Sequence, residues 1–419
     1  MKEKSKFFSI FLLFIPLLIL LLNPFLQENI VSSIWYYIIL YLGFSCILYL
    51  CYLSLKKYPI KYKKEYFPIL ILFLFMIWVG ITTLLSDDLL TSLGGNLYRR
   101  EGFLTYISYA GFYLTAILVP DKDKMKFYKF FVIVGLILSI LTICKNPISN
   151  LFVGTSDEYK SIFHQFNHFG YFLLMTIICD INLFLFEEKK EKKVFYFISF
   201  IILMQMLMKN NTFGSYIAVL GAIMVMSIYF LFINPKRKQI IFLLLSFFLL
   251  SIDYSNPSNN AYSEFSRNIL SLTNINYKNI NDSKEQKKID ALGTNRGELW
   301  KGAICLIKEK PITGYGLDNI KNRYEKIGVM NADRPHNIIL QMSVFVGIPG
   351  MILYVTAIAS IVIGLLINIK KLKYEILISF FVVIGYFVSS LTANSMYYTT
   401  PYFMVFLGYA TSGLLKIKK

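Results

Sequence analysis

The stretch YFPILILFLFMIWVGITTLL, residues 66–85, contains no charged side chain over its whole length. A helix of about 20 residues is long enough to cross about 30 Å of hydrocarbon. Comparable apolar runs recur along the chain, of which 56% is hydrophobic and 17% aromatic. Because lipid cannot satisfy backbone polar groups, and because the runs lack the alternation of a membrane barrel, they are predicted to be helices. The expected fold class is therefore all-α, a polytopic membrane protein.

About twelve transmembrane helices are expected from these runs. They fall at residues 7–26, 34–55, 66–85, 103–119, 128–144, 167–186, 194–209, 212–233, 240–253, 347–369, 374–391 and 398–415. Two of them are short, so eleven or thirteen spans are also compatible with the sequence. The first run follows a basic N-terminus, but its length and the lack of a small-x-small cleavage site favour a span over a signal peptide.

The net charge of +18 follows the predicted topology. Basic clusters come after every second span and hold 25 of the 43 positive residues, whereas the alternate short loops carry five: Arg99, Arg100, Lys145, Lys160 and Lys209. This asymmetry matches the positive-inside rule and predicts a protein of the cytoplasmic (inner) membrane with both termini in the cytoplasm. The basicity is then explained by topology and anionic lipid, and no nucleic acid is expected as a partner.

One long polar segment interrupts the apolar pattern and divides the chain into three parts. Residues 1–253 carry nine predicted spans, residues 254–336 form a large external loop with short helices, and residues 337–419 carry the last three spans. The loop ends on His336, one of only three histidines. It also holds four of the seven arginines, namely Arg267, Arg296, Arg323 and Arg334.

The distribution of arginine differs from that of lysine. Lysine accounts for 36 of the 43 positive residues, yet six of the seven arginines fall on the predicted outer side. Any positively charged side chain satisfies the positive-inside rule. Bidentate binding of two phosphate oxygens, in contrast, requires the planar guanidinium of arginine. The set therefore indicates an anionic, phosphate-bearing external ligand. For any single arginine the alternative is a pairing with a loop carboxylate such as Glu264 or Asp333.

Within the loop, residues 293–300 predict the start of a helix. Asn295 is a suitable N-cap, Glu298 completes a capping-box pattern, and Pro311 ends the helix. Arg296 would then lie in the first turn, beside free backbone N–H groups that attract anions. An ordinary surface helix with a solvated arginine explains the same residues equally well.

Further along, Gly314-Tyr315-Gly316 predicts a turn, and it lacks the remaining residues of a nucleotide-binding phosphate loop. A second short helix is expected at residues 317–327. Asn337 is placed to cap the next helix, whose first turns, 338–346, would lie in the membrane interface before Gly347-Ile348-Pro349-Gly350.

Two shorter external segments are also candidates for a site. Residues 96–102 contain Arg99 and Arg100, which fit either ligand binding or an interfacial anchor. His164 and His168 are spaced to share a helix face, but no third ligand lies near them in the sequence, and the five cysteines are scattered without a CxxC pair. No metal or other cofactor is therefore expected.

In these residues the chain resembles the O-antigen ligase and O-antigen polymerase family. The resemblance rests on TNRGELWKGAICLIKEKPITGYGLDNI (294–320), RPHNIILQ (334–341) and GIPG (347–350), and extends to YRREGFLTYISY (98–109) and FNHFGYFL (166–173). It departs at residues 212–215, where relatives often have an arginine or lysine before the glycine. Either Lys209 replaces that cation or the cation is absent from this chain.

The resemblance implies a multi-span glycosyltransferase. It would move a glycan from undecaprenyl diphosphate to a hydroxyl of a glycan, lipid or protein acceptor on the outer face of the membrane, without a metal, with inversion at the anomeric carbon. His336 would assist the acceptor and Arg296 the leaving diphosphate. The remaining candidate contacts to diphosphate or glycan are Arg99, Arg100, Arg334, Lys209, Trp300, Asn337 and His168.

Three other function classes fit parts of the pattern. A flippase or transporter of lipid-linked oligosaccharides also has about twelve spans, but it usually carries charges along a cavity between them. A scaffold would not need the histidine and arginines. A cell-wall glycan polymerase of the shape–elongation–division type would need an external aspartate motif that the sequence does not show. Ligase and polymerase share the same donor chemistry, so the sequence does not separate them.

Overall fold

In the computed structural model, the part of the chain that is described consists of helices and connecting turns. It comprises residues 13–18, 20, 28–55, 66–144, 159–163, 165–233, 237–251, 267, 270, 287–288, 292–329, 332–392, 394 and 396–416. The first predicted span, 7–26, lies largely outside these residues. The all-α prediction is confirmed for the described part of the chain.

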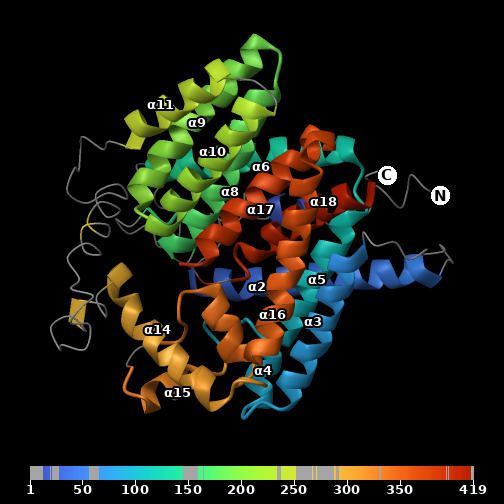
Figure 1. The fold of residues 1–419 in the computed structure, drawn as a ribbon, viewed down its shortest axis with the longest axis vertical. Helices are drawn as coiled ribbons and strands as arrows, with labels where there is room; N and C mark the ends of the chain where they lie inside the picture. Colours follow the sequence, from blue (N-terminus) through green and yellow to red (C-terminus); the bar gives the residue numbers. More distant parts are fainter. Residues whose placement is uncertain are drawn as a thin grey trace.

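Most helices stack into a bundle, with a small helical layer at one end (Figure 1). In chain order the helices are α2 (Glu28–Leu55), α3 (Phe67–Leu84), α4 (Leu89–Gly94), α5 (Phe103–Ile117), α6 (Asp121–Ile143), α8 (Phe166–Phe186), α9 (Lys190–Asn210), α10 (Phe213–Phe232), α11 (Arg237–Ser251), α14 (Leu292–Glu309), α15 (Lys321–Lys326), α16 (Ile338–Ile367), the 3-10 turn Ile369–Lys371, α17 (Tyr374–Ser390) and α18 (Thr400–Lys416). We call the end that carries α4, α14 and α15 the site end.

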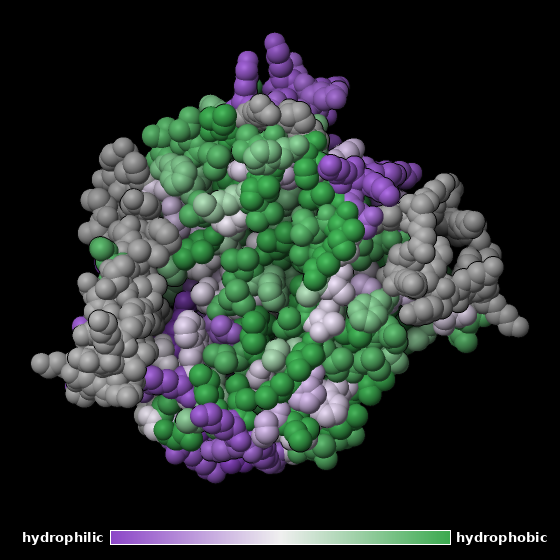
Figure 2. All heavy atoms as spheres, in the orientation of Figure 1, coloured by the Kyte–Doolittle hydropathy of each residue, from purple (hydrophilic) through white to green (hydrophobic). Residues whose placement is uncertain are grey.

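Six of the described helices are long and apolar enough to cross a membrane: Ile34–Leu55, Phe67–Leu84, Asp121–Ile143, Phe166–Phe186, Phe213–Phe232 and Ile338–Ile367. Shorter apolar helices occur at Phe103–Ile117, Lys238–Ser251 and Tyr374–Ser390. The polytopic prediction is thus supported, while the count of twelve stays a prediction. A band of apolar side chains covers the face seen in Figure 2, and most of its polar residues gather toward the two ends.

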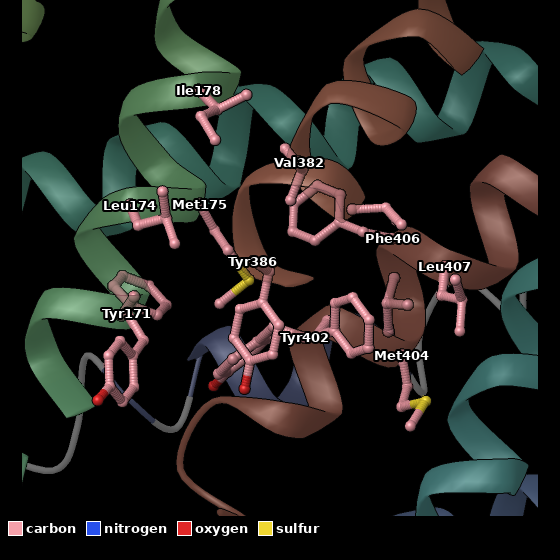
Figure 3. Packing of buried hydrophobic residues seen from close by; sticks show 14 of the residues in the cluster. Tyr171, Leu174, Met175, Ile178, Val382, Tyr386, Tyr402, Met404, Phe406 and Leu407 are labelled. Carbon is pink, nitrogen blue, oxygen red and sulfur yellow. The ribbon is translucent and has the colours of Figure 1, made fainter. Parts of the chain in front are cut away.

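The centre of the bundle is formed by α8, in which every residue from His168 to Leu185 is buried. Leu174 and Ile178 of α8 face Val382 of α17 and Phe406 of α18 (Figure 3). A deeply buried apolar helix with neighbours on several sides gives the bundle a rigid centre, because close-packed interiors resist displacement. The connecting turns at the site end are built on this centre.

At the end opposite the site end, Asp121 joins three elements. Its carboxylate accepts hydrogen bonds from Lys124 of α6 (3.0 Å), Lys373 before α17 (3.3 Å) and Lys416 of α18 (2.5 Å). The helix α6 begins at this residue, seven positions before the predicted span at 128. Acidic Asp121 and Asp123 in the first turn favour this earlier start because they complement the helix dipole.

The helix α16 is broken at Gly347, whose φ of 72° and ψ of 173° are not helical. The break leaves carbonyl groups at the end of segment 338–346 without helical partners. Tyr315 N–H donates to the Val344 carbonyl (3.0 Å) and Gly316 N–H to the Phe345 carbonyl (2.9 Å). The backbone of the predicted Gly314-Tyr315-Gly316 turn therefore completes the broken helix.

Two further contacts hold the break in place. The indole of Trp78 in α3 donates to the Val346 carbonyl at 2.8 Å, and Ile348 N–H donates to the Pro311 carbonyl at 2.8 Å. A Cβ at position 347 would lie 1.9 Å from the Ile312 carbonyl oxygen, so only glycine fits. The segment of α16 that follows His336 is thus bound to the layer at the site end.

Candidate active site at the site end

His336 lies in the turn between α15 and α16, half-buried and with a left-handed φ of 50°. Its ring nitrogen Nδ1 is 3.2 Å from Nδ2 of Asn394, which lies between α17 and α18. The next residue, Asn337, caps α16 as predicted: its Oδ1 accepts from the N–H groups of Ile339 (3.0 Å) and Leu340 (3.1 Å). The histidine is therefore fixed between the start of α16 and the turn before α18.

The helix α14 supplies Trp300 and Arg296. The Trp300 indole donates to the carbonyl of Pro335, the residue before His336, at 2.9 Å. The helix begins at Leu292, so the predicted N-cap at Asn295 and the first-turn position of Arg296 are wrong. An asparagine inside a helix costs only up to about 0.7 kcal/mol relative to alanine, which is too little to stop the helix there. Any anion binding by Arg296 therefore depends on its side chain.

Three of the arginines at the site end are held by aspartates. Arg99 binds Asp333 through two nitrogens, with Nε to Oδ2 at 2.5 Å and Nη2 to Oδ1 at 3.0 Å. Arg334 binds Asp318 at 2.6 Å, and Arg323 pairs with Asp87. The pairing with Asp333, the alternative raised for a single arginine, is confirmed for Arg99. Glu264 lies outside the described residues.

Asp318 connects three segments of the site end and was not predicted. Its Oδ1 accepts from Arg334, and its Oδ2 accepts from the backbone N–H groups of Asn96 (2.8 Å) and Glu101 (3.3 Å). Asp318 and Arg334 are both buried, and Asp318 has a left-handed φ of 59°. Breaking such a buried pair leaves an uncompensated charge, so Asp318 fixes the loop that carries Arg99 against the segment that carries His336.

Two arginines at the site end differ from the others. Among the residues that the structure describes, neither Arg296 nor Arg100 has a carboxylate within ion-pair distance. The Arg100 guanidinium lies over the ring of Tyr36, with Cζ 5.4 Å from the ring centroid. Arg296 acts on His336 through its charge. Of the described arginines at the site end, these two have a guanidinium that is not engaged by a described carboxylate and could bind an external anion.

The surroundings of His336 lower its pKa to about 4. Burial is the main cause, and the charges of Arg296 and Arg99 add to it, with Asp333 opposing. Protonation is unfavourable in a poorly solvated site next to cations. His336 is therefore neutral at pH 7, and the same burial and cations that keep it neutral also make it a weaker base than a free imidazole. Burial alone would raise the pKa of Asp333, but Arg99 holds it below its usual value.

The backbone is strained at this site. Arg100, Asp318 and His336 are non-glycine residues with φ between 50° and 59°. Such conformations cost on the order of 1–3 kcal/mol each and persist where the surrounding contacts fix them. Here the contacts are the aspartate pairs and the Trp300 and Asn394 hydrogen bonds described above. The strain indicates a site held in one arrangement by its neighbours.

The other two predicted contacts, His168 near the start of α8 and Lys209 in the last turn of α9, lie against tyrosine rings. The His168 ring is buried and stacks on Tyr398, with centroids 5.3 Å apart. Lys209 lies over the ring of Tyr159 at 5.5 Å. His164 lies outside the described residues, and a search of the described ones finds no group of three or more His, Cys, Asp or Glu suited to a metal ion.

Residues 198–355 match the family model described as O-antigen ligase. The matched region contains Arg296, Trp300, His336 and the break at Gly347, but not Arg99 or Arg100. The match supports the assignment of the chain to the O-antigen ligase and polymerase family, and with the apolar helices it indicates an integral membrane protein. It also supports a membrane glycosyltransferase-like role in surface polysaccharide assembly. None of the curated proteins compared with this chain matches it.

Proposed function

We propose that this member of the O-antigen ligase and polymerase family transfers a glycan from undecaprenyl diphosphate to an acceptor hydroxyl at the site end, on the outer face of the cytoplasmic membrane. The observation that carries the proposal is the hydrogen bond from Trp300 to the residue before His336, which brings α14, the helix of Arg296, against the histidine. Arg296 has no carboxylate partner among the described residues, and its charge acts on His336. A proton acceptor beside an unpaired guanidinium is the arrangement that displacement of a diphosphate requires.

The leaving group is assigned to the arginines. As the bond between the anomeric carbon and the diphosphate oxygen breaks, the electron pair and the negative charge go to the diphosphate. Arg296 and Arg100 would bind those oxygens. Arg99 and Arg334 are paired with Asp333 and Asp318 and would act by holding the loop segments of the site in place. Because the guanidinium groups stabilise this charge, the mechanism needs no metal.

The acceptor is assigned to His336. The acceptor oxygen forms its bond to the anomeric carbon on the face opposite the diphosphate, and its proton passes to His336, so the configuration inverts. Asn394 and the Trp300–Pro335 contact orient the imidazole. A bound diphosphate would offset Arg296, the largest charge effect on His336, and so raise the pKa of the histidine. The base thus becomes stronger once the donor is in place.

The bilayer supplies the rest of the donor site. The apolar outer surface of the spans suits the prenyl chain, and the diphosphate would sit at headgroup depth near the site end. The acceptor, whether glycan, lipid or protein, would approach from the aqueous side over residues 292–336. Residues 1–253 and 337–419 would form the membrane part, with 254–336 as the external loop.

The experiment is a transfer assay in cells that lack the native gene. Variants His336→Ala and Arg296→Ala are compared with Lys308→Ala, an exposed lysine on the same helix as Arg296. We expect both site variants to accumulate lipid-linked glycan on the outer leaflet while the control transfers it normally. Intact transfer by both variants at normal protein levels would refute the proposal. Accumulation of the donor on the inner leaflet in the deletion strain would identify a flippase instead.

A further inference from the structure

A cleft of about 820 Å³, lined by both polar and apolar side chains, opens at the site end beside the His336 site. Asn96 to Arg99 and the start of α4 form one wall, and the segment from Asp318 to Asn322 forms the other, closed by Ala332 and Asp333. Binding sites for small molecules typically measure about 300–1,000 Å³. The cleft could not be predicted from the sequence, because its walls come from segments more than 200 positions apart.

The charges of the lining nearly cancel. Asp333 is neutralised by Arg99, and Asp318 by Arg334. The remaining charged side chains of the lining, Asp88 and Lys321, are of opposite sign. A cleft without excess charge gives no advantage to phosphate or carboxylate, so the lining suits a polar, uncharged molecule.

The polar groups of the lining can both donate and accept hydrogen bonds. The side-chain oxygen of Asn96 accepts from the N–H groups of Tyr98 (3.0 Å) and Arg99 (2.8 Å), which leaves its NH₂ group directed elsewhere. Asn319 makes only a long contact of 3.4 Å to the Tyr315 carbonyl, and Asn322 is exposed. Several amide side chains close together can donate hydrogen bonds to, and accept them from, a ligand rich in hydroxyl groups.

An aromatic side chain completes the lining. The ring of Tyr98 is 42% exposed and carries the Arg99 guanidinium on one face, with Cζ 4.6 Å from the centroid. A tyrosine ring that is partly exposed to solvent can pack against the C–H groups of a sugar, whose hydroxyl groups then face the polar side chains. The Tyr98 hydroxyl accepts a hydrogen bond from Gln165, so the ring rather than the hydroxyl is the part available to a ligand. The cleft thus combines amides, an aromatic ring and balanced charge.

We infer that this cleft binds an oligosaccharide, the glycan part of the donor or of the acceptor. Arg99 connects it to the proposed reaction centre, because its fork holds Asp333 in the cleft wall and its charge acts on His336. The cleft wall therefore reaches to within three residues of the proposed proton acceptor along the chain, at Asp333. The identity of the glycan rests on the proposed function, whereas the cleft's preference for an uncharged polyol rests on its lining alone.

Binding is measured on the purified full-length protein in nanodiscs. The probe is the oligosaccharide released by mild acid from lipid-linked glycan of the host, titrated by calorimetry and by saturation-transfer NMR. The test variant is Asn319→Leu/Asn322→Leu, and the matched control is Lys326→Leu on the same short helix, outside the cleft. We expect at least a tenfold weaker affinity for the test variant and an unchanged one for the control.

A transfer assay identifies which glycan occupies the cleft. A higher KM of the test variant for the lipid-linked donor assigns the donor glycan, and a higher KM for the acceptor assigns the acceptor glycan. No binding by the wild-type protein, or an unchanged affinity in the test variant, would overturn the inference. The binding measurement does not depend on glycan transfer. It therefore tests the cleft even if His336→Ala transfers glycan normally and the proposed function is refuted.

Discussion

The indole of Trp300 donates a hydrogen bond to the carbonyl of Pro335, at 2.9 Å, and so fixes the backbone directly before His336. Trp300 lies on α14 and Pro335 in the turn before α16. Along the chain these two elements are separated by α15. This contact lies next to a residue with a left-handed φ, where the backbone needs external support. It therefore links the helix that carries Arg296 to the proposed proton acceptor.

Trp300→Phe removes this hydrogen bond and keeps most of the ring. We expect a loss of about 0.5–1.5 kcal/mol of stability, the usual worth of one hydrogen bond, and about a tenfold lower kcat with little change in KM. The measurement is steady-state transfer with purified protein. A change confined to KM would argue against a positioning role for Trp300.

Arg296→Lys keeps the positive charge but removes the planar fork. If Arg296 binds two diphosphate oxygens, this variant should lose about 100-fold in transfer rate, close to the loss in Arg296→Ala. Activity is compared with that of Lys308→Arg, which makes a matched exchange on the same helix. Wild-type rates in Arg296→Lys would mean that only charge is needed at this position.

The pH dependence follows from the low pKa of His336, about 4. The neutral ring is the reactive form, so kcat/KM should stay constant from about pH 5.5 upward and fall as the pH approaches 4. Arg296→Ala removes a neighbouring positive charge, which favours protonation and raises the pKa toward its ordinary value. The acidic limb of the profile should then move to higher pH.

The change in the pKa of His336 can also be measured without an activity assay. Proteins with ¹³C-labelled histidine are titrated by NMR, and the His336 signal is identified by its loss in His336→Asn. An identical His336 titration in wild type and Arg296→Ala would show that the two side chains do not interact.

Asp318→Ala leaves the buried Arg334 without its partner and frees the loop that carries Arg99. Removal of one partner from a buried ion pair costs roughly 3–5 kcal/mol. We expect a clear drop in thermal stability in detergent, together with loss of transfer. Glu325→Ala, at an exposed position on α15, should change stability by no more than about 0.5 kcal/mol. Equal melting temperatures for the two variants would contradict the role given to Asp318.

Gly347→Ala tests the break in α16. The added Cβ would meet the Ile312 carbonyl at 1.9 Å, and φ there is 72°, so the contact between the two segments should open. Gly221→Ala is the control, because a Cβ at that position meets nothing within 4 Å. We expect low protein levels and increased protease cleavage after residue 311 for Gly347→Ala only. Normal levels and unchanged cleavage would show that glycine is not required at position 347.

Features that depend on neighbours in the sequence were predicted well. The apolar runs gave the helical class, Asn337 was recognised as a cap, and Gly314 and Gly316 as parts of a turn. The second short helix was predicted at 317–327 but forms only at Lys321–Lys326, because Asp318 adopts a left-handed conformation and turns toward Arg334. Local propensity could not foresee this, since a tertiary ion pair decides it.

Features that depend on contacts between distant segments were missed. Asn394 meets His336 across 58 positions, and Asp318 meets the N–H of Asn96 across 222. The sequence also could not show which arginines pair with an aspartate and which, like Arg296 and Arg100, do not. Asp333 had been considered as an ion-pair partner, but not for a particular arginine. The low pKa of His336 likewise arises from burial and from cations brought together only by folding.

The hydrogen bonds across Gly347 have a consequence for protein engineering. The turn at residues 311–316 and the segment 344–348 share their backbone hydrogen bonds, with Trp78 completing the set. A chimera that joins one protein's loop to another's spans at residue 337 would cut through this shared unit. Exchanges between homologues intended to alter glycan choice should therefore transplant residues 292–350 as one block, matched to the residue at position 78.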